Sequence, residues 1–252
     1  MRRWHGLTLL ALVALALGAT AGSKMKNWGE DHMRVDGVRL EHSRLVELDG
    51  EVGGAFELEV GLGDIEVRAA SGDRAHLRLK IHEVEPNDIT VKLEDGRLRL
   101  VSASDNPGAI GDAWLELPAG CELELTAGYG DIDISGMKGG RRIIAETGLG
   151  QVTLEDVSGI HEIEVSTGKG DIRLGPAAAL ELADLSTGMG DIRVRDAEVK
   201  ELEVGTGMGG IDFLDCRFGI VSGGTGLGKV HFKRTEYERS DVGSGWGGVK
   251  GD

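Results

Sequence analysis

The chain has 252 residues, of which 42 are glycine and only 4 are proline. The glycines lack the three-residue period of collagen and alternate with Val, Ile and Leu, which favours many short strands and tight turns over disorder. The formal net charge of −15 disfavours nucleic acid and anionic membranes as partners, although an acidic surface also simply keeps a protein soluble.

Residues 1–21 have the composition of a secretory signal peptide. Arg2 and Arg3 form its charged region, Leu7–Leu17 its apolar region, and Ala19–Ala21 a small-residue cleavage site. The apolar run is shorter than the roughly 20 residues that a membrane span needs, and no cysteine follows it to carry a lipid anchor. We therefore expect cleavage after Ala21 and export to the periplasm, the cell surface or the medium, with no membrane span left.

Several segments ahead of the chain's middle have the pattern of β-strands. Residues 22–34 show no periodicity and are expected to form a flexible lead, whereas residues 35–119 predict an N-terminal β-strand region. Phe56–Val60 alternates apolar and acidic residues, as a strand with one buried face does, and His76–His82 alternates in the same way. Trp114–Gly120 predicts a further strand, ended by proline and glycine.

A hairpin is expected between the second and third of these strands. Ile89–Leu93 and Leu98–Val101 flank the dipeptide Asp95-Gly96, whose chemistry suits a tight turn with positive φ. Residues 102–112, which follow the hairpin, are expected to form a loop.

A seven-residue motif, G-x-G-D-I-x-V, recurs through the second half of the chain. Successive copies begin 19 or 20 residues apart, a period typical of stacked repeats, and one further copy lies apart at Gly61. Residues 120–252 therefore predict a β-solenoid of about seven rungs, each rung being two short strands joined by a corner. The copies begin at Gly128, Gly148, Gly168, Gly188, Gly207, Gly226 and Gly245.

Apolar columns in the aligned copies indicate which side chains face the interior. Before the motif they stand at odd offsets from its first glycine, as Leu125 and Val165 do, and after it at even offsets, as Ile132 and Ile172 do. Because residues two apart share one face of a strand, the chain must change phase between the two strands. We expect the G-x-G to form this corner, since a Cβ would obstruct both the bend and the neighbouring rung.

The residue between the two glycines is mostly apolar. It stands at an odd offset from the first glycine, like the inward-facing residues before the motif, so we expect it to pack inside the corner. The alternative is that these residues form an exposed adhesive ridge. Its one charged member, Lys169, would extend its charge past the corner. The position holds Tyr129, Leu149, Lys169, Met189, Met208, Leu227 and Trp246.

The residue after the second glycine is aspartate in Asp131, Asp171 and Asp191. Stacked carboxylates collect calcium in some β-rolls, but here Gln151 and Lys229 interrupt the column, and whether it binds calcium stays open. Aspartate beside a bend usually accepts backbone N–H groups, and we expect that structural role. No metal or other cofactor is expected.

Outward-facing charged residues are the candidates for an interaction surface. Arg173 and Arg193 stand on adjacent rungs beside aspartates, a faint version of the clusters that solenoid enzymes use to cleave acidic polysaccharides. An exposed ladder of alternating charge explains them more simply. Asp212 and Trp246 are two further candidates. Trp246 stands in the last rung, which has no obvious polar cap and leaves a strand edge unpaired. Either Trp246 covers this edge, or the edge can pair with another copy of the chain.

The two cysteines are expected to be free and buried. Cys121 and Cys216 fall in different columns about five rungs apart, whereas a disulfide needs Cα atoms within about 7 Å.

The repeated Gly-x-Gly-Asp-Ile-x-Val, the Thr or Ser before it, and the lead-in Leu117–Gly120 before Leu123 and Leu125 resemble the bacterial family of β-strand-repeat putative adhesins, whose function is unknown. The resemblance covers about Val35 to Asp252. It implies an exported β-solenoid of the cell envelope, and it supplies no catalytic residue.

We therefore expect an all-β protein in which an N-terminal strand region precedes a single-stranded parallel β-solenoid (β-helix) of 19–20-residue rungs, right-handed by the usual crossover rule. The expected function is non-enzymatic: an adhesin-like binding or scaffold module of the cell envelope, with an envelope glycan or protein as partner. The alternatives are a solenoid polysaccharide-degrading enzyme and a structural protein that self-associates end to end.

Overall fold

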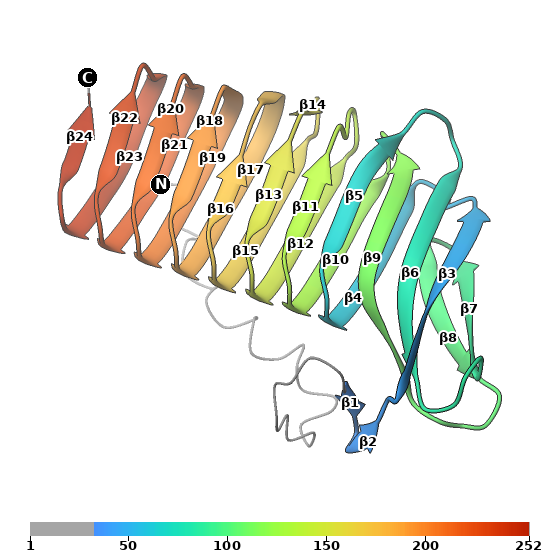
Figure 1. The fold of residues 1–252 in the computed structure, drawn as a ribbon. Coiled ribbons are helices and arrows are strands. Elements are labelled where there is room, and N and C mark those ends of the chain that lie inside the picture. Colours follow the sequence, from blue (N-terminus) through green and yellow to red (C-terminus); the bar gives the residue numbers. More distant parts are fainter. Residues whose placement is uncertain (1–32, 252) are drawn as a thin grey trace, which may run out of the picture.

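The computed structural model describes residues 33–251, in which every regular element is a β-strand (Figure 1). The predicted signal peptide and most of the predicted lead, residues 1–32, lie outside the described residues. Two long sheets face each other across a shared core along the molecule, and each rung contributes one strand to each sheet. The predicted all-β fold with a parallel β-solenoid is confirmed.

The first strands of the rungs form sheet 1 and the second strands form sheet 2, with rung neighbours parallel and in register. The first strands are β4 (Ala55–Leu62), β10 (Glu122–Tyr129), β12 (Arg142–Leu149), β15 (Glu162–Lys169), β17 (Ala177–Met189), β19 (Ala197–Met208), β21 (Arg217–Leu227) and β23 (Glu236–Trp246). The second strands are β5 (Ile65–Ala70), β11 (Ile132–Ser135), β13 (Val152–Glu155), β16 (Ile172–Leu174), β18 (Ile192–Arg195), β20 (Ile211–Leu214), β22 (Val230–Lys233) and β24 (Val249–Gly251), while the short β14 (Val157–Ser158) pairs with β17.

The copy of the motif at Gly61 forms a rung of the same stack. Its strands β4 and β5 pair in parallel with β10 and β11, so that Leu62 lies opposite Tyr129 and Ile65 opposite Ile132. The residues between β5 and β10 leave the stack and build the strands that cover its N-terminal end.

Antiparallel strands close that end of the solenoid. Strands β3 (His42–Gly50), β6 (Ala75–Glu83) and β9 (Gly108–Pro118) extend sheet 2 beyond β5, and the hairpin β7 (Ile89–Glu94) and β8 (Arg97–Ser102) lies beyond β4 in sheet 1. The small pair β1 (Arg34–Val35) and β2 (Val38–Arg39) stands apart. The predicted hairpin is confirmed, with φ of 50° at Asp95 and 74° at Gly96.

The loop predicted over residues 102–112 is wrong in its second half, because β9 already begins at Gly108. Strand pairing continues from Ala113 opposite Leu79 to Ile110 opposite Ile81, with a register shift between them. The residues that suggest a turn, Gly111 and Asp112, therefore form a β-bulge within a paired strand.

The predicted core columns are confirmed. Side chains four and six residues after the first glycine are buried through the stack, from Ile132 and Ile134 to Val230 and Phe232, and only Val249 on the last strand is half exposed. Near the C-terminal end aromatic rings fill the core, where Phe213 contacts both Phe218 and Phe232.

The G-x-G corner is confirmed, and its two glycines are required for steric reasons. At Gly170 φ is 157°, and a Cβ there would stand 1.8 Å from the carbonyl oxygen of Gly150 in the preceding rung. A Cβ at Gly168 would stand 2.6 Å from the carbonyl oxygen of Gly148. The rungs stack so closely at the corner that only glycine fits.

The prediction that the residue between the two glycines packs inside the corner is wrong. Leu149, Met189, Met208 and Leu227 are 41–52% exposed, and Trp246 is 80% exposed. Strand parity fails here because the residue is the last of its strand and is followed by the second glycine, whose positive φ turns the chain. The residue therefore lies on the outside of the corner, where its side chain is exposed.

Candidate binding surfaces

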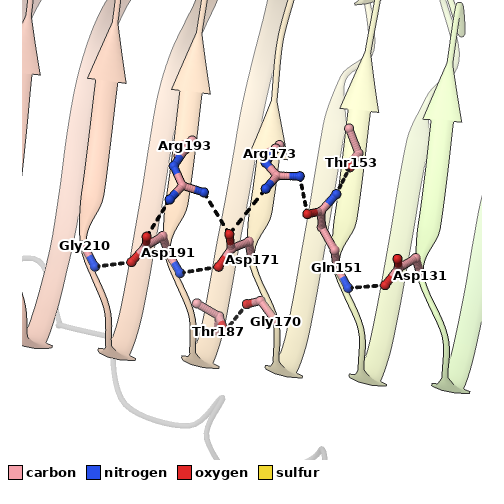
Figure 2. Close-up of polar contacts among 10 residues, drawn as sticks. All are labelled: Asp131, Gln151, Thr153, Gly170, Asp171, Arg173, Thr187, Asp191, Arg193 and Gly210. Carbon is pink, nitrogen blue, oxygen red and sulfur yellow. Dashed lines mark hydrogen bonds and ion pairs between the residues drawn. The ribbon is translucent and has the colours of Figure 1, made fainter.

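The aspartate column links each rung to the next through the backbone. Asp131 Oδ1 accepts the N–H of Gln151 at 2.7 Å, and Asp171 Oδ1 accepts the N–H of Asp191 at 2.9 Å (Figure 2). Asp191 Oδ1 in turn accepts the N–H of Gly210 at 2.8 Å. The predicted role of these carboxylates as acceptors beside the bend is confirmed, and the donor belongs to the following rung.

Arg173 and Arg193 contact the other oxygens of these carboxylates. Together the side chains form a continuous row of ion pairs that we call the Asp–Arg ladder: Asp171, Arg173, Asp191 and Arg193. Figure 2 shows Arg193 bridging two rungs, 2.8 Å from Asp171 Oδ2 and 2.6 Å from Asp191 Oδ2. Arg173 contacts Asp171 at 3.5 Å and also the side-chain oxygen of Gln151. The four charges are therefore satisfied within the ladder.

The ladder also sets the protonation of its central carboxylate. Burial raises the pKa of Asp171, but the N–H of Asp191 and the guanidinium of Arg193 outweigh burial and hold that pKa below its ordinary value. A carboxylate held ionised in this way is unsuited to donate a proton at neutral pH. Among residues 33–251 no group of three His, Cys, Asp or Glu side chains is arranged to hold a metal ion.

Asp212 and Trp246, the other two candidates from the sequence, lie on separate surfaces. Asp212 stands on β20 and pairs with His231 on β22, with 3.0 Å between Oδ1 and Nδ1. Trp246 ends β23 at the last corner, and its exposure shows that it does not plug the end of the solenoid.

The exposed residues between the corner glycines form a continuous row along one edge of the molecule, which we call the corner ridge. Strand pairing places its members directly opposite one another from rung to rung. At the strand spacing of about 4.8 Å, eight rungs give a ridge on the order of 34 Å long. It consists of Leu62, Tyr129, Leu149, Lys169, Met189, Met208, Leu227 and Trp246.

An acidic column runs along the outer face of sheet 1. Glu164, Asp184 and Glu203 lie directly opposite one another on β15, β17 and β19. Burial, the carboxylate of Glu203 and that of Glu164 together raise the pKa of Asp184 to about 6. Glu164 is paired with Arg142 at 2.8 Å, whereas Asp184 and Glu203 have no ion pair within residues 33–251. The column therefore concentrates negative charge that is only partly neutralised.

A basic cluster, Arg195, Lys229, Lys233 and Lys250, occupies the outer face of sheet 2 near its C-terminal end. The apolar columns of the sequence do not reveal it, because its members come from separate rungs. The signal was present in Lys229, which replaces aspartate in its column, and in the outward parity of Lys233 and Lys250.

Both thiols are buried and free, as predicted. Burial first, and then the neighbouring charge of Glu122, raise the pKa of the Cys121 thiol to about 11. Burial likewise raises the pKa of Cys216. Thiols with raised pKa values are poor nucleophiles, so both cysteines act as small core residues.

Within residues 33–251, no helix has the length and apolar character to cross a membrane.

These features define the molecule as a β-solenoid whose two glycine-cornered sheets present flat outer faces and an apolar edge. The chain belongs to the Toastrack DUF4097 family, whose model matches residues 31–219. No curated protein matches it.

Solved structures share the fold at low sequence identity. A protein described as a "putative adhesin" from Bacteroides fragilis NCTC 9343 superposes with a TM-score of 0.58 at 16% identity, covering 83% of this chain and 97% of its own. A second "putative adhesin", from Parabacteroides distasonis ATCC 8503, has a TM-score of 0.49 at 9% identity, with coverages of 84% and 97%. A "putative lipid binding protein" from the same organism has a TM-score of 0.47 at 15% identity, with coverages of 82% and 96%.

Proposed function

We propose that the protein is a non-enzymatic, exported binding module of the bacterial cell envelope, and that its main contact surface is the corner ridge. The ridge carries the proposal because soluble proteins rarely expose a row of large apolar side chains without a partner for it, and four such residues follow one another from Met189 to Trp246. The signal-like residues 1–21 support export, and the fold shared with a protein described as a "putative adhesin" supports a binding role.

The ridge is suited to binding because it is rigid before a partner arrives. Each ridge residue follows the first glycine of a corner, and hydrogen bonds to the neighbouring rungs hold that corner in place. Covering a half-exposed Leu or Met contributes about 1 kcal/mol, and little of this is lost to ordering the backbone. Several ridge residues together therefore supply enough free energy for specific association.

The test compares two triple variants for co-sedimentation with washed cell-envelope fragments. Met189→Ser, Met208→Ser and Leu227→Ser remove about 3 kcal/mol of apolar contact, so we expect roughly a 100-fold weaker affinity. The control, Leu45→Ser, Leu182→Ser and Ile220→Ser, removes exposed apolar side chains elsewhere and should bind as the unaltered protein does. Equal binding by both variants would refute the ridge as the contact surface.

A polysaccharide-degrading activity is the second candidate, and the acidic column is the observation in its favour. Asp184, with its raised pKa, faces Glu164 and Glu203, and glycoside hydrolysis requires a pair of carboxyl groups of which one can donate a proton. This reading predicts reducing ends released from an acidic polysaccharide, and their loss in Asp184→Asn. A preparation that releases none at any pH from 4 to 8 would reject it.

End-to-end self-association is the third use that the geometry permits. Strands β23 and β24 have one free edge each among the described residues, and Tyr237 and Val249 beside them are about half exposed. Sedimentation equilibrium over a wide concentration range, with and without calcium, tests it. A constant monomer mass would reject both self-association and a calcium-dependent assembly.

A further inference from the structure

The outer face of sheet 2 carries different charges along the solenoid. Around β5 and β11 it carries Asp64, Asp131 and Asp133, and burial together with the neighbouring carboxylates raises the pKa of Asp133. Toward the C-terminal end, beyond the Asp–Arg ladder, it carries the basic cluster. A concentrated positive area on a chain of net charge −15 is an unexpected feature that solubility does not explain.

Strand pairing places the members of the basic cluster on one face. Arg195 lies opposite Leu214, which lies opposite Lys233, and His231 lies opposite Lys250. Lys229, directly before β22, and Lys233, at its end, are four residues apart, a separation of about 13 Å along an extended chain. The four cations thus span three strand spacings, roughly 14 Å, across the sheet.

These cations are free to bind a ligand. All four side chains are exposed, and none of them lies within ion-pair distance of a carboxylate in residues 33–251, whereas their neighbours Arg193 and His231 are paired with aspartates. Exposed, separated lysines do not converge on one small anion. They suit a chain that carries a negative charge every few ångströms.

Trp246 adds a flat apolar surface beside the cluster. The N–H of Gly228, which precedes Lys229, donates to the carbonyl oxygen of Trp246 at 2.9 Å, so that the last corner lies against the start of β22. The indole is 80% exposed. An exposed indole provides a face on which the C–H side of a sugar ring can pack, and its N–H remains available to a hydroxyl group.

We propose that the basic cluster and Trp246 form a binding site for an acidic polysaccharide, with the lysines and Arg195 contacting its carboxylates and Trp246 contacting a sugar ring. The carboxylates of Asp64, Asp131 and Asp133 disfavour contact with such a chain farther along the face. A single-stranded nucleic acid also carries negative charge, and its bases stack on aromatic rings. We favour a polysaccharide because the signal-like residues 1–21 indicate export to the cell envelope. The site shares Trp246 with the corner ridge, but its four cations are distinct from Met189, Met208 and Leu227, which the ridge test replaces, so either proposal can fail alone.

The experiment titrates residues 22–252 with polygalacturonate, with dextran as the neutral polymer, and follows binding by calorimetry and by tryptophan fluorescence. We expect binding to polygalacturonate alone, weakening as salt rises, because each contact releases a counterion. The fluorescence change should disappear in Trp246→Ala and persist in a variant that alters Trp114 instead.

Two triple variants with the same change of net charge test whether polygalacturonate binds at the basic cluster. Lys229→Gln, Lys233→Gln and Lys250→Gln should weaken polygalacturonate binding at least about tenfold, whereas Lys92→Gln, Lys138→Gln and Lys200→Gln, on other surfaces, should leave it unchanged. Equal weakening by both variants would overturn the proposal, since only net charge would then matter. Failure of the unaltered protein to bind at low salt, or tighter binding of single-stranded DNA than of polygalacturonate, would overturn it too.

Discussion

The hydroxyl of Thr187 donates a hydrogen bond to the carbonyl oxygen of Gly170, 3.0 Å away in the preceding rung. The same contact recurs at each corner of the regular stack, and at the last corner Ser244 makes it to Gly228 at 2.8 Å. Thr187 is 5% exposed, so its hydroxyl has little access to water as an alternative partner. The threonine column therefore ties each corner to the one before it.

Replacing this hydroxyl by a methyl group tests that role. Thr187→Val keeps the shape but leaves the carbonyl of Gly170 without this donor, which should cost about 1–2 kcal/mol and lower Tm by roughly 2–6 °C. Thr187→Ser retains the donor, as Ser244 does naturally, and should lose less than half as much. Differential scanning calorimetry distinguishes these outcomes, and equal losses in both variants would show that packing rather than the hydroxyl matters.

Glycine at the second corner position should be irreplaceable. Gly170→Ala places a Cβ 1.8 Å from the backbone oxygen of Gly150, and neither backbone can move without disturbing its own rung. We expect a loss of about 4 kcal/mol or more, seen as a large fall in Tm or a loss of cooperative unfolding. Gly205→Ala is the control, because a Cβ at Gly205 meets nothing within 4 Å. A Tm for Gly170→Ala close to that of the control would contradict the geometry of the corner.

The exposure of the corner ridge can be tested by placing an aspartate on the ridge and, for comparison, an aspartate in the core. Ile172→Asp buries a charge without a partner and should unfold or fray the stack. Met189→Asp adds the same carboxylate to the exposed ridge, where water solvates it, and should change the free energy of unfolding by less than about 1 kcal/mol. Urea unfolding followed by circular dichroism measures both. Comparable destabilisation would mean that the ridge faces inward after all.

The sequence predicts the stack well because its period is local and repeated. Ile132, Val152 and Ile172 occupy the same place in successive copies, and a buried column must repeat wherever rungs pair in register. The orientation of Met189 was not predicted because strand parity assumes a straight strand, whereas Met189 ends β17 beside Gly190, whose φ of 152° turns the chain. Within β9 the bulge at Gly111 likewise depends on a partner strand that local sequence does not reveal.

The candidate surfaces were only partly predictable, and for a different reason. Arg173 and Arg193 stand beside aspartates in consecutive repeats, so their pairing follows from the alignment of the copies. The basic cluster draws Arg195 and Lys250 from rungs that are 55 residues apart in the chain. Only the register of four consecutive strands in sheet 2 brings them to one face, and no single repeat contains that information.

The acidic column should make the stability of the protein fall as pH rises. The folded pKa of Asp184 is about 6, above its ordinary value of 3.8, so between these values the folded state binds more protons than the unfolded state. By linkage, the contribution of Asp184 to the free energy of unfolding decreases as pH rises through this window and is lowest above pH 6.

Asp184→Asn removes the charge and should raise the free energy of unfolding by about 1–2 kcal/mol at pH 7.5, after allowance for partial exposure, with little increase at pH 4. Glu203→Gln should give a smaller gain of the same sign, because Asp184 then faces one carboxylate fewer. Urea unfolding at both pH values measures these differences, and a gain at pH 4 as large as that at pH 7.5 would show that the effect is not the charge of Asp184.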